Sequence, residues 1–306
     1  MLVVLLGALL MAARTPMWGS PVVELDVSSE ALRFVVDGNL DLVGRSHEAD
    51  RPGATGVPLA TPWIYLRGVR VVTPEGEEVE VPEDRAVLAS ELQQLAVSRD
   101  CAVNITTFPD GYVRLAISRT RADSASACSV RGTAWSDPTR SGPDSLGLAP
   151  LLENVPASGR LEIRARPGWN QPAVLQVHPA RPLRISRIPV SRLSFETLDR
   201  GRYPESSILN GTLGFPGQRT SPIALGMSDT LSLDQPRGTI VDLTIGGSVR
   251  SRFSGTASAA RTPSRGSIKP TLLDQVQSSP LLLAIGAIVS LLAGLADLTH
   301  LMGRRE

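Results

Sequence analysis

The stretch GTIVDLTIGGSVRSRFSGTAS, residues 238–258, decides the fold class of this 306-residue chain. Polar and apolar residues alternate in its first half, which places three apolar side chains on one face of a strand: Val241, Leu243 and Ile245. Gly246 and Gly247 then offer the positive backbone dihedrals of a tight hairpin turn. The return strand again has one regular face, made of Val249, Ser251 and Phe253. The stretch therefore predicts a β-hairpin.

Two arginines of this hairpin, Arg250 and Arg252, fall on the face opposite Phe253. Because they form a charged row on a strand, they are the candidate partner-binding face of the chain. The alternative is that both side chains are only solvated.

Similar strand patterns recur along the chain, for example at residues 22–27, 32–36 and 111–118. The 27 glycines and 24 prolines divide the sequence into short segments and leave few windows for long helices. We therefore expect a mostly β, β-sandwich-like extramembrane region of one or two units. Residues 82–97 are an exception, since Pro82 and an acidic first turn favour a short helix there.

Composition divides the chain into seven segments. These are a hydrophobic signal or anchor segment (1–20), a β-rich unit (21–121), a flexible polar linker (122–158), a second β-rich unit (159–258), a juxtamembrane stalk (259–279), a transmembrane helix (280–302) and a basic tail (303–306). Residues 23–38 and 187–201 match in part, with Phe34 aligned to Phe195. Duplication of one β module explains this match, and chance similarity between strands is the alternative.

The transmembrane prediction depends on the run from Leu281 to Ala296, whose one polar side chain is Ser290. As a helix this run covers about 24 Å, and its continuation to Met302 completes the crossing of a bilayer core of about 30 Å. Small residues one turn apart are the candidate helix–helix contact: Gly286, Ser290 and Gly294. Ionisable residues at the far end are the candidate membrane interface: Asp297, His300, Arg304 and Arg305.

Positive charge beside a span is biased towards the cytoplasm, so Arg304 and Arg305 favour a cytoplasmic tail and an extracytoplasmic β region. The apolar run from Met1 to Ala13 has the length of a signal-peptide hydrophobic region. If this run is instead retained as a second span, the β region faces the cytoplasm.

The two cysteines, Cys101 and Cys128, are a candidate disulfide in an oxidising compartment, and two separate buried thiols are the alternative. The sequence predicts no metal, cofactor or catalytic residue, since His47, His178 and His300 lie far apart and no catalytic motif is present. A net charge of +1 gives no general electrostatic reason to expect a nucleic-acid partner.

Together these patterns predict a membrane-anchored, non-enzymatic binding or scaffolding subunit of a bacterial envelope assembly. It would cross the inner membrane once, contact the lipid bilayer, and bind a protein partner or itself through the C-terminal helix. One alternative is a two-span effector or sensor whose β domain is cytoplasmic and which oligomerises in the bilayer. Another is a membrane-tethered hydrolase.

Overall fold

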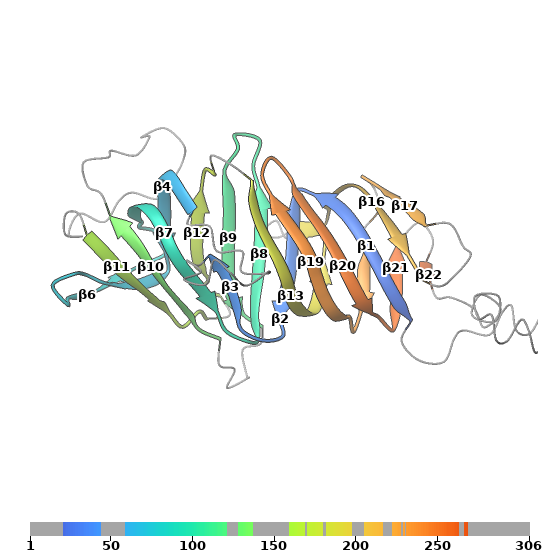
Figure 1. Ribbon diagram of the computed structural model, residues 1–306, viewed down its shortest axis with the longest axis horizontal. Coiled ribbons are helices and arrows are strands. Elements are labelled where there is room, and N and C mark those ends of the chain that lie inside the picture. The colour runs from blue at the N-terminus through green and yellow to red at the C-terminus, as the bar shows by residue number, and fades with distance from the viewer. Residues whose placement is uncertain are drawn as a thin grey trace, which may run out of the picture.

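The chain folds almost entirely into antiparallel β-strands (Figure 1). The computed structural model describes residues 21–43, 59–120, 128–136, 159–168, 170–179, 182–197, 205–216, 222–227, 229, 231–262 and 266–268. These residues hold one large sheet and a two-stranded sheet, with the apolar side chains packed inside. The mostly β, sandwich-like fold expected from the sequence is thereby confirmed.

The terminal predictions lie outside this part of the chain. Segments 1–20, 280–302 and 303–306 are not among the described residues. Among those that are described, no helix has the length and apolar character needed to cross a bilayer.

The strands fall into two runs along the chain. The first run is β1 (Val22–Ser29), β2 (Ala31–Val36), β3 (Leu40–Val43), β4 (Leu59–Arg67), β5 (Val69–Val72), β6 (Glu78–Val81), β7 (Val87–Val97), β8 (Cys101–Thr107), β9 (Val113–Arg119), β10 (Val130–Ser136) and β11 (Gly159–Ala165). The second run is β12 (Ala173–Val177), β13 (Leu183–Ser194), β14 (Glu196–Thr197), β15 (Glu205–Ser206), β16 (Ile208–Gly214), β17 (Ile223–Gly226), β18 (Ser232–Asp234), β19 (Arg237–Ile245), β20 (Val249–Thr256), β21 (Ala259–Thr262) and β22 (Gly266–Ile268). Strand β10 lies inside the range 122–158 that composition marks as a linker.

Two modules with the same strand order make up the large sheet. In the first module the neighbouring strands are β2, β8, β9, β12 and β4. In the second they are β13, β19, β20, β1 and β16. Beyond these five strands the modules differ: β4 continues through β7 into the β10–β11 hairpin, whereas β13 continues through β18 into the β21–β22 hairpin. The shared order supports a duplication of one β module.

The two modules exchange their leading strands. β1 precedes β2 in the chain as β12 precedes β13, yet β1 lies between β20 and β16 of the second module (Figure 1). In the same way β12 lies between β9 and β4 of the first module. Neither module is therefore complete without a strand from the other half of the chain.

Strands β2 and β13 join the modules as an antiparallel pair, with Val36 opposite Val190. Leu32 pairs with Ile105 of β8, and Ile185 pairs with Leu243 of β19. Ile105 and Leu243 each lie two residues before the end of their strand. Leu32 and Ile185 therefore occupy equivalent positions in the two modules. Val36 follows Leu32 by four residues and Val190 follows Ile185 by five. With one extra residue in β13, Val36 and Val190 are therefore equivalent as well. The structural alignment of the copies thus differs from the alignment of Phe34 with Phe195 that the sequence suggested.

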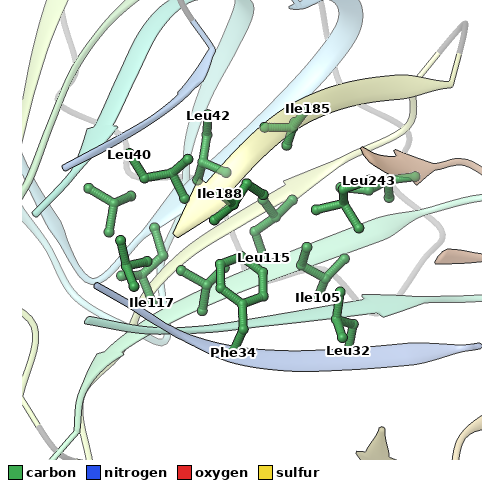
Figure 2. Packing of buried hydrophobic residues seen from close by; sticks show 14 of the residues in the cluster. Leu32, Phe34, Leu40, Leu42, Ile105, Leu115, Ile117, Ile185, Ile188 and Leu243 are labelled. Carbon is green, nitrogen blue, oxygen red and sulfur yellow. The ribbon is translucent and has the colours of Figure 1, made fainter. Parts of the chain in front are cut away.

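One continuous core runs through both modules. Figure 2 shows Leu32 and Phe34 of β2, Ile105 of β8 and Leu115 of β9 beside Ile188 of β13. All five side chains are at most 3% exposed. Because these side chains come from both copies, the join between the modules is part of the core.

The hairpin of residues 238–258 forms as β19 and β20, but two of its details were predicted wrongly. Val241 is 41% exposed, because β19 has a bulge there that brings Ile240 into register with Phe253 and into the core. Ile245 pairs with Val249, so the turn has three residues, and neither Gly246 nor Gly247 has a φ in the left-handed range.

The helix predicted within residues 82–97 was also wrong, because Val87–Val97 is strand β7. β7 pairs along one edge with β3 and β4 and along the other with β10. Bonding on both edges and burial of Leu92 and Leu95 outweigh the helix propensity of this Ala-, Leu- and Gln-containing stretch.

Candidate functional site

A wide groove of about 1390 Å³ lies over the polar face of four neighbouring strands of the first module, β6, β5, β11 and β10. Its lining is strongly polar and carries both signs of charge: Arg70, Glu78, Glu80, Glu83, Asp84, Arg131, Glu162, Arg164 and Arg166. Sites for small organic molecules are typically enclosed, mostly apolar and at most about 1,000 Å³. The groove is therefore better suited to a polar segment of a partner macromolecule.

Two ion pairs lie on the surface of the groove. Arg70 lies 3.7 Å from Glu78, and Arg164 lies 2.9 Å from Glu162. The hydrogen bond that Arg164 donates to Glu162 raises the pKa of this guanidinium. All four side chains are at least half exposed, so these pairs contribute little to stability and can rearrange around a partner.

Gly68 sets the bend that directs β5 away from β4 and towards the groove. Its φ is 63°, and a Cβ at this position would collide with the carbonyl oxygen of Pro172. Glycine is the residue that adopts this positive φ and allows this close backbone approach without strain. The bend allows β4 to pair with β12 while β5 pairs with β11 and β6.

The predicted partner-binding arginines lie on the outer face of the second module. Arg250 donates hydrogen bonds to both carboxylate oxygens of Asp26 on β1, each at 3.3 Å, and Arg252 donates one at 3.4 Å. Asp242 pairs with Arg252 across β19 and β20. Asp26 thus binds both arginines of this face, and Asp242 lies across from Arg252.

The arginine cluster predicts a pH-dependent contribution from Asp26. The hydrogen bond from Arg250 lowers the pKa of Asp26 below its ordinary 3.8; burial opposes this effect, and the charges of Arg250 and Arg252 add to it. Such a contribution is present above the ordinary pKa and is lost as pH falls through the lowered value. We expect Asp26→Asn to destabilise the fold by less than about 1 kcal/mol at neutral pH, and the difference from wild type to be smaller at about pH 3, below the ordinary pKa of 3.8. Urea unfolding at both pH values measures it, and an equal difference at both would contradict the assignment.

The corresponding face of the first module is also polar but is differently composed. Arg67 on β4 donates a hydrogen bond of 3.5 Å to the side-chain oxygen of Gln176 on β12. Burial and then the charge of Arg114 lower the pKa of Arg67, while Glu83 opposes them. Arg114 on β9 and Asn104 on β8 are half-buried, and the Nε of Arg114 and the Oδ1 of Asn104 are buried without hydrogen-bond partners.

Cys101 and Cys128 are joined by a disulfide, with their Cα atoms 5.0 Å apart. The bridge ties the start of β8 to the segment before β10, and both residues are buried. Next to it, the backbone N–H of Ser129 donates to Oγ of Ser98, and the N–H of Ser98 donates to the carbonyl of Ser129.

Several predicted residues lie outside the described part of the chain: Gly286, Ser290, Gly294, Asp297, His300, Arg304, Arg305 and His47. His178 is described and packs edge-on against Tyr112, with ring centroids 5.1 Å apart. Within the described residues, no group of three or more His, Cys, Asp or Glu side chains is arranged to hold a metal ion.

Sequence reasoning missed Arg67 and Arg114 altogether. Residues 111–118 were predicted as a strand, but nothing in the sequence shows which residues lie across from Arg114. The information that identifies their neighbours is the cross-strand register, which only the fold supplies.

No protein-family model, curated protein or solved structure matches the chain.

Proposed function

We propose that this chain is a non-enzymatic binding or scaffolding protein of a bacterial envelope, anchored in the inner membrane by residues 280–302, with its two β modules outside the cytoplasm. The observation that carries the binding role is the wide, polar groove over the face of strands β6, β5, β11 and β10. Its exposed ion pairs, such as Arg164 with Glu162, offer hydrogen-bonding groups of both signs to a polar partner segment.

The disulfide supports the extracytoplasmic location. Protein disulfides persist in oxidising compartments and are rare in a reducing cytoplasm. The apolar run of residues 281–296 and the arginines that follow it support anchoring with a cytoplasmic tail.

The location is tested by labelling cysteines placed at chosen positions in the full-length chain. Both native cysteines are buried and joined to each other, so they do not compete for a membrane-impermeant maleimide. Met227 is 73% exposed, which makes Met227→Cys an accessible reporter on the second module. We expect the impermeant maleimide to label Met227→Cys in spheroplasts without permeabilisation.

The matched control is Arg305→Cys in the tail, which should be labelled only after the membrane is opened. If Met227→Cys also requires permeabilisation, the proposed location is wrong and the two-span protein with a cytoplasmic β domain takes its place.

A further inference from the structure

Strand β6, which forms one margin of the groove, has a free edge. Among the described residues it pairs only with β5, and Figure 1 shows it at the left end of the molecule. The N–H of Thr73 donates to the carbonyl of Glu77 at 2.9 Å, so these two residues form a hydrogen-bonded pair at the end of the hairpin. Hydrogen-bonded and non-hydrogen-bonded pairs alternate along an antiparallel ladder. Val79 therefore bonds to β5, while the backbone N–H and C=O groups of Glu78 and Glu80 point towards the free edge.

The hairpin that ends in this edge is strongly acidic. Between Arg70 and Arg85 the chain has no basic side chain and six acidic ones: Glu75, Glu77, Glu78, Glu80, Glu83 and Asp84. Glu78 lies 3.7 Å from Arg70, whereas Glu80, opposite Arg70 on the ladder, forms no ion pair within the described residues. Both glutamates are exposed and line the groove. The free edge therefore carries an excess of negative charge.

These charges determine which strand can add to the edge. A free edge accepts a further strand through its unpaired backbone groups. Pairing with β6 of a second copy is disfavoured, because every antiparallel register that joins the outward-facing residues places glutamate opposite glutamate. On the other face of β6, Val79 is half-buried and packs against the core. An added strand therefore needs positive charge on the groove face and an apolar side chain on the core face.

We propose that the free edge of β6 is a docking site for an extended, basic segment of a partner protein, which adds to the sheet as a strand. The backbone of this segment bonds to the outward-facing N–H and C=O groups of Glu78 and Glu80. Residues directly opposite the two glutamates share their face, so basic side chains at positions i and i+2 lie beside both carboxylates. The residue between them lies beside Val79. The segment recognised thus reads basic–apolar–basic. This inference rests on the proposed binding role and names the chemistry of the partner.

The test measures peptide binding to the full-length protein in phosphatidylcholine nanodiscs, whose headgroups carry no net charge, by ligand-detected NMR. The probe is acetyl-TKVRVKT-amide, which alternates basic and apolar side chains. The same peptide with N-methyl groups on its basic residues keeps every charge but loses the N–H donors that face β6. We expect this form to bind about tenfold or more weakly, since it loses at least two backbone hydrogen bonds. The acidic peptide acetyl-TEVEVET-amide should show no binding to the wild type.

Reversal of the edge charges should reverse the preference. The double variant Glu78→Lys with Glu80→Lys is expected to bind the basic peptide about tenfold or more weakly and to gain binding of the acidic peptide. An unfolded variant could not gain this binding, so the result separates recognition from stability. Glu80→Pro removes an outward N–H but no bond between β6 and β5, and it should weaken binding more than Glu80→Gln. The matched control is Glu24→Lys, since Glu24 is an exposed glutamate on β1, which is paired on both edges. It should leave binding unchanged.

Three results would each overturn the assignment: no binding of the basic peptide, equal binding of its N-methylated form, or an equal effect of Glu24→Lys. Equal binding of the N-methylated form would mean that the peptide contacts side chains of the groove without adding as a strand, and the proposed binding role would stand. None of the three results changes the location of the β modules, which the cysteine labelling measures independently.

Discussion

Leu25→Ala is expected to destabilise the second module by about 2–5 kcal/mol, although Leu25 lies in the first strand of the chain. Leu25 is 1% exposed and pairs with Leu213 of β16 on one side and Phe253 of β20 on the other. Removing its side chain leaves a cavity between strands that lie more than 180 residues further along the chain. Urea unfolding measures the loss, and amide hydrogen exchange should show faster exchange in β16 and β20.

Glu24→Ala is the matched control, because Glu24 is the exposed neighbour of Leu25 on the same strand. It should change stability by less than about 0.5 kcal/mol. If Leu25→Ala accelerates exchange in β8 and β9 while leaving β16 and β20 protected, β1 does not belong to the second module and the strand exchange is wrong.

The strand exchange has a consequence for how the chain unfolds. Each module contains a central strand from the other half of the chain, and β2 pairs with β13 between them. One buried cluster also runs through both modules. Loss of either module therefore removes a strand from the other, so the two should unfold together as one cooperative unit.

The sequence predicted strands well where the alternation of apolar residues is regular. Leu115 and Ile117 alternate without interruption, and they are buried as the pattern indicates. Prediction failed at β-bulges, because one extra residue moves every later side chain to the other face. At Val241 this shift exposes a residue that the pattern places inside, and Ile240 takes its place in the core.

Strand β7 shows the same effect on a larger scale. Thr133 and Ala134 of β10 pair with Gln94 and Leu92, so Gln93 is an extra residue in β7. The bulge spaces the buried residues Leu92 and Leu95 three apart, as on one face of a helix. A bulged strand therefore resembles a helix in sequence, and only its pairing partners distinguish the two.

The different surroundings of Arg114 and Arg250 could not be predicted from the sequence for a related reason. The two arginines have a similar local sequence context. One has an aspartate across the neighbouring strand and the other has Val174 near it. This contrast appears only when the register of β12 and β1 is known, and both strands pair with residues far away in sequence.

Loss of the disulfide should produce the other large effect. Replacing both Cys101 and Cys128 by serine is expected to destabilise the fold by about 3.5 kcal/mol, the loop-entropy value for a bridge with a sequence separation of 27. The loop contains strand β9, which pairs with β8 and β12. Without the bridge the unfolded chain gains freedom throughout this loop. Urea unfolding of the double variant and the wild type, both without reductant, measures the difference.

Reductant separates the bridge from the side effects of substitution. Wild type unfolded in the presence of reductant should lose most of the same stability, while the double variant should not respond to reductant. A double variant as stable as oxidised wild type would show that the bridge contributes nothing to stability.

The size of the effect also bears on the location of the β modules. A fold that loses about 3.5 kcal/mol on reduction loses much of the 5–15 kcal/mol typical of a native protein. Such a chain would be poorly suited to a reducing cytoplasm, so a large effect of reductant favours β modules that work outside it.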